Sequence, residues 1–160
     1  MDRAARAVEQ WGRERPDLDA SPMAVLGRLA EAAYVTRDRI NPLFARFGLQ
    51  PGEFDVLATL RRSGKPHALT PTALYEATMI SSGAMTNRLD RLERAGLIAR
   101  EPHPTDRRGV VVRLTEKGLA LIDEAVTAHV ENEHQILSGL TAEERDTLAA
   151  LLAKLIASVG

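Results

Sequence analysis

The sequence predicts a mainly α-helical protein with one small β-hairpin. Over most of the chain, apolar residues recur at three- and four-residue spacing, which is typical of amphipathic helices. Residues 69–114 differ: they begin with a capped short helix, a turn and a second helix rich in arginine. Two short strands follow, joined by a tip that contains Asp and Arg. This order predicts a winged helix-turn-helix, with N- and C-terminal helices that form a dimerisation region.

The composition limits the classes of protein to consider. A chain of 160 residues, 44% hydrophobic and 27% charged, is sufficient for one globular domain with an association module. No apolar run approaches the roughly 18 residues that span a bilayer, and the N-terminus lacks the apolar region of a signal peptide. We therefore expect a cytoplasmic protein with no membrane partner. The absence of Cys excludes disulfides, thiolate catalysis and Cys-ligated zinc.

Charge is distributed unevenly along the chain. The formal net charge is −1, yet the stretch from Asn87 to Arg113 holds seven arginines and four acids, so it carries +3 and the other residues together carry −4. A basic stripe on an acidic body is typical of a nucleic-acid interface. The same arginines could simply solvate a helix and a hairpin, so charge alone leaves both interpretations open.

We expect three regions: residues 1–47 as N-terminal helices for dimerisation and a ligand-pocket wall, 48–114 as the DNA-binding domain, and 115–160 as C-terminal dimerisation helices. The first region begins with a helix over residues 2–13. Ser21 is expected to be the N-cap of a second helix, with Pro22 at its first position. That helix is expected to kink or break near Asn41-Pro42 and to end at Gly48.

The later helices follow from capping residues. A short helix is expected from Pro51 to about Arg62, and Thr115 opens a long one to about Leu140. The segment Thr141–Glu144 is a capping box that opens the last helix, to about Ser158. Packing against a second copy would cover the apolar stripe of that helix in a C2 dimer, and packing within the chain is the alternative. The stripe consists of Leu148, Leu151, Leu152, Leu155 and Ile156.

Within the motif, Thr70 is expected to cap the first helix, and the second spans about residues 82–95. Met85, Leu89 and Leu92 form its buried seam at i, i+4 and i+7. The opposite face can meet DNA, because Asn suits adenine and Arg suits guanine or phosphate. It consists of Gly83, Asn87, Asp90, Arg91 and Arg94. Arg88, about 60° from the seam, could point inward toward a pocket. The predicted DNA contacts are Ser81, Ser82, Thr86, Asn87 and Arg91, together with Arg107 and Arg108 at the wing tip.

The wing is expected to comprise strands over residues 98–103 and 110–114. An arginine at the tip can enter the minor groove, where the negative potential is concentrated. Asp106 can hold a neighbouring arginine through a bidentate pair. A solvated turn would have the same composition, so the tip is informative only because it follows a helix-turn-helix pattern.

Over residues 22–158 the chain resembles the MarR family of winged-helix transcriptional regulators. The resemblance implies a homodimer with interlocking terminal helices that binds a short pseudo-palindrome and usually represses nearby genes. It also implies that Arg108 is the minor-groove arginine and that Asp106 is its partner. The matching segments are Gly48-Leu49, Glu53–Leu57, Leu69-Thr70, Ser81–Leu89, Leu92-Glu93, Gly96–Ile98, Asp106–Gly109 and Leu114–Gly118.

A finer resemblance is to the urate-responsive, PecS-like subgroup of this family. It implies a ligand site made by Trp11, Asp55, Arg88 and Arg100. A planar anionic heterocycle can stack on an indole and pair with guanidinium groups, and it would repel a nearby carboxylate. Because Arg88 belongs to the predicted DNA-reading helix, urate or a similar effector could move that helix out of register with DNA.

Each of the four ligand residues also has an ordinary structural interpretation. Trp11 can anchor a terminal helix by packing, and Asp55 can complement a helix dipole. Arg100 can pair with Glu101 or Asp106 across the hairpin. Related regulators with similar residues respond to other purines, phenolic acids or small carboxylates, so the ligand's identity is less constrained than the pocket.

Enzymatic and metal chemistry are poorly supported. The sequence has no Walker loop, dinucleotide fingerprint, nucleophile elbow or HExxH motif, so we expect no enzyme and no cofactor. His129 and His134 are separated by about 500° of helical rotation, which favours a surface helix over zinc ligation. Two classes of function remain: a ligand-responsive DNA-binding repressor, and a winged-helix module for protein or nonspecific nucleic-acid binding. A ligand-insensitive regulator is a weaker third.

Overall fold

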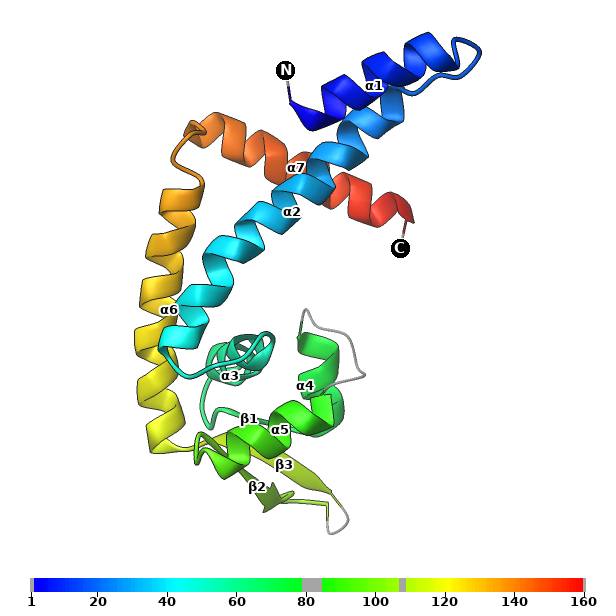
Figure 1. Cartoon of the computed structure of the whole chain (residues 1–160). Helices are drawn as coiled ribbons and strands as arrows, with labels where there is room; N and C mark the ends of the chain where they lie inside the picture. The colour runs from blue at the N-terminus through cyan, green and yellow to red at the C-terminus, as the bar shows by residue number, and fades with distance from the viewer. Residues whose placement is uncertain (1, 79–84, 107–108, 160) are drawn as a thin grey trace. The chain divides into compact units, whose positions relative to one another are not determined.

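The computed structural model describes residues 2–78, 85–106 and 109–159. They form a mainly helical protein with one small antiparallel sheet (Figure 1). The chain divides into two compact units, Met1–Ile40 and Asn41–Gly160. Each unit is described on its own below.

In the N-terminal unit, helix α1 (Arg3–Glu14) packs closely on the first part of helix α2 (Ser21–Arg46). A Cβ added to Gly27 would lie 3.1 Å from the Cβ of buried Ala4, so glycine allows this approach. Asp2 caps α1 by accepting a hydrogen bond from the Ala5 N–H at 2.8 Å, and its other oxygen lies 2.7 Å from Nη2 of Arg28. The Ala5 hydrogen bond and then the Arg28 guanidinium lower the pKa of Asp2.

Helix α2 continues through Pro42 without interruption, so the expected break is wrong. The boundary between the two units falls just before this proline, after Ile40. Beyond it, Phe44 is buried in the C-terminal unit and stacks on Phe54, with ring centroids 4.2 Å apart. This packing stabilises the end of the helix, where proline removes a backbone hydrogen bond. Ser21 is the first helical residue rather than the N-cap.

The C-terminal unit contains the winged motif. Its order is α3 (Glu53–Arg62), β1 (Ala68–Leu69), α4 (Pro71–Ala77), α5 (Met85–Arg94), β2 (Ile98–Pro102) and β3 (Val110–Leu114). The sheet is antiparallel, with strand order β1-β3-β2. Sequence did not predict β1, because a two-residue strand has no measurable alternation. Helix α3 begins two residues later than expected, because Gly52 adopts a left-handed conformation at φ 83°.

The core of this unit is apolar and joins all the elements of the motif. Thr70 caps α4 as predicted, by accepting from the Ala73 N–H at 3.1 Å. The predicted seam of α5 is confirmed, since Met85, Leu89 and Leu92 are all buried. The largest fully buried side chains are Leu57, Leu60, Leu74, Leu92, Ile98 and Ile122.

Two helices follow the wing: α6 (Glu116–Ile136) and α7 (Ala142–Val159). Thr115 caps α6, which ends four residues before Leu140 because the chain tightens there into short turns. The capping box of α7 is confirmed: the Thr141 N–H donates to Glu144 Oε2 at 2.9 Å, and the Glu144 N–H donates to Thr141 Oγ1 at 3.3 Å. Helix α7 buries none of its residues in the single chain.

Candidate nucleic-acid interface

Helix α5 has one buried and one exposed face. Opposite its buried seam, Thr86, Asn87 and Arg91 are exposed to solvent, as expected for side chains that meet DNA. Two other predicted contacts, Ser81 and Ser82, lie outside the described residues. The face carries donors and acceptors at the positions from which a helix can read base edges.

Arg91 is also anchored to the protein. Its Nε lies 2.7 Å from Oε1 of Glu53, a carboxylate at the start of α3 that is only 3% exposed. The second oxygen of Glu53 accepts the Gln50 N–H at 2.7 Å. A buried carboxylate that is paired in this way fixes the stem of Arg91, while the exposed remainder of the side chain still faces solvent.

Arg88 lies against the turn that precedes α3. Its Nε donates to the Pro51 carbonyl at 3.3 Å, and a Cβ on Gly52 would lie only 2.6 Å from that nitrogen. Its Nη1 is buried and has no hydrogen-bond partner among the described residues. A buried guanidinium N–H without an acceptor is costly, so an incoming acceptor would be bound favourably here.

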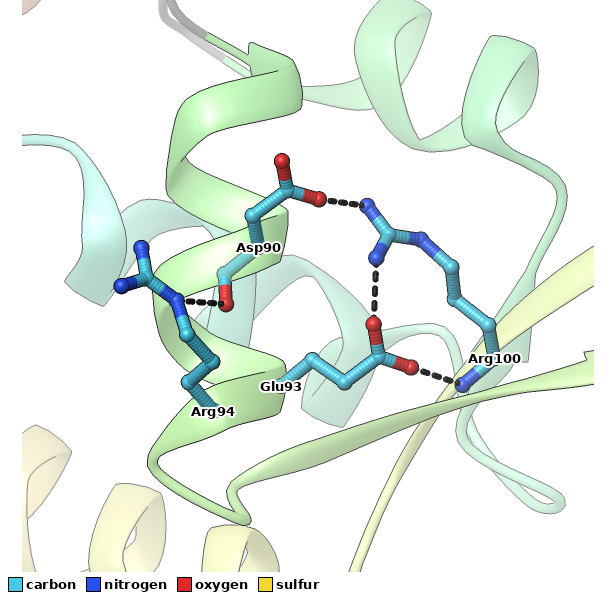
Figure 2. Close-up of polar contacts among 4 residues, drawn as sticks. All are labelled: Asp90, Glu93, Arg94 and Arg100. Carbon is cyan, nitrogen blue, oxygen red and sulfur yellow. Dashed lines mark hydrogen bonds and ion pairs between the residues drawn. The ribbon is translucent and has the colours of Figure 1, made fainter.

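Arg100, at the start of the wing, is held by two acids of α5 (Figure 2). Its Nη2 lies 2.6 Å from Asp90 Oδ1, and its Nη1 pairs with Glu93 Oε2. The hydrogen bond that Arg100 donates to Asp90, with a further contribution from Glu93, raises the pKa of Arg100. The alternative interpretation, in which Arg100 pairs across the hairpin, named other partners: Glu101 pairs instead with Arg113 at 2.8 Å.

The remaining ligand residues lie elsewhere. Asp55, in the first turn of α3, lies 3.7 Å from Nη1 of Arg62. The Nη2 of the same arginine donates to the Ala77 carbonyl at 2.6 Å. Trp11 belongs to the N-terminal unit, where it is 43% exposed and lines a surface hollow of α1 with Gln10 and Glu14. The contacts thus give Asp55, Arg88 and Arg100 different immediate partners.

The wing tip is organised by His103. Its Nδ1 accepts hydrogen bonds from the Thr105 N–H at 3.3 Å and the Asp106 N–H at 3.1 Å. The Gly109 N–H donates to the Asp106 carbonyl at 3.0 Å, which closes the turn. Arg107 and Arg108, the predicted tip contacts, lie outside the described residues. The imidazole therefore holds the backbone of Thr105 and Asp106 in place.

His129 is half-buried rather than exposed, which modifies the expectation of a surface helix from helical spacing. Its side chain is 15% exposed and contacts the rings of Phe44 and Phe54, with centroids 5.0 and 4.8 Å away. An imidazole is flat enough to fill a gap beside stacked aromatic rings, and helical phase alone does not reveal such a gap. Within residues 2–78, 85–106 and 109–159, no cluster of His, Asp or Glu could hold a metal ion.

Several polar residues of the interface were missed in the sequence. Nothing local marks Glu53 or Arg62, because their partners are distant in sequence. Asp90 and Glu93 did leave a signal: acids at i and i+3 share one helix face and can be bridged by one arginine. His103 left none, since a histidine before a turn is equally compatible with simple exposure.

The comparisons with known proteins agree with this geometry. A family model described as "MarR family" matches residues 47–109. The HTH-type transcriptional regulator PecS of Dickeya dadantii is 46% identical over 147 residues, which cover 92% of this chain and 89% of that protein. The chain belongs to the MarR family. Like its MarR-family relatives, it is a DNA-binding transcriptional regulator and not an enzyme.

Solved MarR-family structures share the fold. A mutant MarR from Escherichia coli in complex with operator DNA superposes with a TM-score of 0.72 at 28% identity, covering 91% of this chain and 96% of that one. BpsR of Bordetella bronchiseptica, whose DNA binding is regulated by 6-hydroxynicotinic acid, gives 0.73 at 29% identity, covering 82% and 91%. Among the described helices, none is long and apolar enough to cross a membrane.

Proposed function

We propose that this MarR-family member is a ligand-responsive repressor that binds a pseudo-palindromic operator as a homodimer. Helix α5 would enter the major groove, and the wing would reach the adjacent minor groove. The observation that carries the proposal is the division of α5 into a buried apolar seam and an exposed face with Thr86, Asn87 and Arg91. A helix held in this way on a winged sheet can present base-reading side chains in a fixed orientation.

Dimerisation is supported by α7. Its stripe includes Leu148, Leu151 and Ile156, which are 43%, 60% and 68% exposed in the single chain. Contiguous apolar side chains on one helix are unusual at a permanently solvated surface. A second copy would cover them, and its two-fold symmetry would match a palindromic site.

The DNA contacts proposed are Asn87 and Arg91 to base edges, Ser81, Ser82 and Thr86 to phosphates or bases, and Arg107 and Arg108 at the wing, supported by Asp106. The test is a gel-shift titration with the DNA upstream of the protein's own gene, against unrelated competitor. We expect a discrete complex that resists competitor, and Asn87→Ala should weaken it by about 1–3 kcal/mol. Gln135→Ala, an exposed amide change on α6, should leave it unchanged.

We propose a planar aromatic anion, such as urate, as the effector. The buried Nη1 of Arg88 has no hydrogen-bond partner within the part of the chain that the structure describes, which supports an acceptor at that position. Asp55 and Arg100 supply further charge in the same unit. BpsR, with a hydroxynicotinic acid as its regulator, indicates that the fold can respond to this class of compound. Trp11 remains the stacking residue that the family resemblance predicts.

Adding urate to the gel shift tests the effector. Release of the operator complex by urate, reduced in Arg88→Ala and Asp55→Ala, would support the site. Trp11 is the only tryptophan in the chain, so its fluorescence reports stacking directly. Operator binding that no aromatic anion disturbs would favour the ligand-insensitive regulator. Absence of any specific complex, with both upstream and sequence-selected DNA, would favour the interaction module.

A further inference from the structure

Two acids on the proposed DNA-reading helix need an explanation. Asp90 and Glu93 lie on α5, where an uncompensated carboxylate would be repelled by the phosphates of bound DNA. Both carboxylates are instead turned onto one guanidinium, that of Arg100 on strand β2 (Figure 2). Their negative charges are therefore compensated by an ion pair within the protein.

The geometry joins helix to strand at three points. Arg100 Nη2 donates to Asp90 at 2.6 Å, Nη1 pairs with Glu93, and the backbone N–H of Arg100 donates to the other oxygen of Glu93 at 3.1 Å. Because β2 is an outer strand of the sheet, this last bond occupies a backbone donor that faces away from β3. The planar guanidinium presents a separate nitrogen to each carboxylate in a fixed geometry, which the single ammonium nitrogen of lysine cannot reproduce.

We propose that Asp90, Glu93 and Arg100 form a clamp that sets the orientation of α5 relative to the wing, and thereby the protein's preference for its operator. This inference rests on the proposed DNA-reading role of α5. All three are positioning residues, because they act on DNA through the helix that they hold. Reading bases requires the helix to stay within about 0.5 Å of its productive place. The clamp is the contact that fixes α5 relative to strand β2 through polar groups, in addition to the buried seam and the contacts of Arg88 and Arg91 with the start of α3.

The clamp is distinct from the packing that keeps the domain folded. Its members are 30–48% exposed, and ion pairs of this kind contribute little to folding. The buried side chains Leu89, Leu92 and Ile98 already hold α5 against the sheet. Breaking the clamp should therefore change DNA discrimination while the melting temperature stays nearly constant.

The first test is Arg100→Lys, which keeps the charge and removes the fork. The probe is an operator selected from random-sequence DNA by the wild-type protein, and binding is measured without effector so that any ligand role of Arg100 is silent. We expect affinity for the selected operator to fall about tenfold, with affinity for random DNA unchanged. The matched control is Arg61→Lys on α3, because the fork of Arg61 also pairs with a carboxylate, that of Asp123 on α6, away from α5. Equal affinities for Arg100→Lys and wild type, or an equal fall in both variants, would overturn the clamp.

A second test uses the sign of the effect. The double variant Asp90→Asn with Glu93→Gln makes α5 more positive, so simple electrostatics predicts tighter binding to every DNA. The clamp predicts weaker operator binding together with stronger binding to random DNA. Glu76→Gln on α4 together with Glu124→Gln on α6, two exposed neutralisations, serves as the charge-matched control and should strengthen or preserve both affinities. A parallel rise for operator and random DNA in the double variant would refute the clamp. Failure of the wild-type protein to select any operator would instead refute the proposed function.

Discussion

Helices α5 and α7 each carry apolar residues at three- and four-residue spacing, but the surroundings of these residues differ. The stripe of α5 is buried in its own domain, with Leu89 and Leu92 only 3% and 1% exposed. In the stripe of α7, Leu148, Leu151 and Ile156 are exposed and the other two leucines are half-buried, so none of its residues is buried in the single chain. The same periodicity thus predicts an apolar face in both helices but does not indicate which surface covers it.

The polar contacts of the two helices differ in the same way. Arg88, Arg91 and the Asp90–Glu93 pair connect α5 to the turn before α3, to buried Glu53 and to strand β2. The side-chain bonds of Arg145 and the Thr141 capping box connect α7 only to its own first turn and the residues just before it. Side-chain bonds to other elements therefore fix the orientation of α5. Among the residues that the structure describes, these side-chain bonds of α7 stabilise the helix itself and do not link it to other elements.

The largest effect on stability is expected from truncating a buried side chain of α5. Leu92→Ala should lower the free energy of unfolding by about 2–5 kcal/mol, since it removes a fully buried side chain and leaves a cavity. Leu151→Ala on α7, measured by urea denaturation at a concentration where the chain is monomeric, should cost almost nothing. Similar losses of unfolding free energy in Leu92→Ala and Leu151→Ala would show that the two helices do not differ in how their apolar residues are packed.

A comparable effect on association is expected from charging the exposed stripe. Leu151→Asp together with Ile156→Asp should weaken the proposed dimer by about a hundredfold or more, because two apolar contacts are lost and charges are buried. Sedimentation velocity over a concentration series measures this change. Ala150→Asp with Ala153→Asp, on the opposite side of the same helix, is the matched control. If the two pairs behave alike, α7 is not the dimer interface.

A smaller effect tests the attachment of α5 to the turn before α3. Gly52→Ala places a Cβ at φ 83° and 2.6 Å from the Nε of Arg88. The left-handed conformation alone should cost about 1–2 kcal/mol in thermal unfolding, and Arg88 must move as well. Gly48→Ala shares the positive φ but meets no atom within 4 Å, so it isolates the backbone contribution. Only Gly52→Ala should also change the release of operator DNA by urate. If Gly52→Ala and Gly48→Ala change this release equally, Arg88 does not take part in binding the effector.

Much of the fold could be predicted because its signals are local. The seam of α5, the Thr70 and Thr115 caps and the Thr141 capping box depend on neighbours within a few residues. The uninterrupted α2 could not be predicted in this way, because distant packing of Phe44 on Phe54 opposes the local effect of Pro42. Strand β1 exists only because β3 pairs with it.

The site was predicted less completely for the same physical reason. Which face of α5 is exposed follows from helical phase, and so do Asn87 and Thr86 as candidates. The partners of Asp55, Arg88 and Arg100 depend on how elements meet in space, and Arg100 pairs with acids of α5 rather than with Glu101 across the hairpin. A sequence therefore identifies candidate charges more readily than their partners.

The smallest effect compares two helix caps with the same chemistry. Thr115 caps α6, which buries Gly118, Ile122 and Ala125, and Thr141 caps the exposed helix α7. Each Thr→Ala change should remove about 1 kcal/mol of helix stability. For Thr115→Ala the loss should appear in global unfolding, because α6 and the winged domain share a core. For Thr141→Ala we expect unchanged global unfolding of the monomer, but faster amide hydrogen exchange in α7 and a weaker dimer, since ordering that helix becomes part of association. If Thr141→Ala lowers the free energy of global unfolding by the full amount of about 1 kcal/mol, α7 already folds cooperatively with the rest of the chain. Its exposed stripe would then not need a second copy to order the helix.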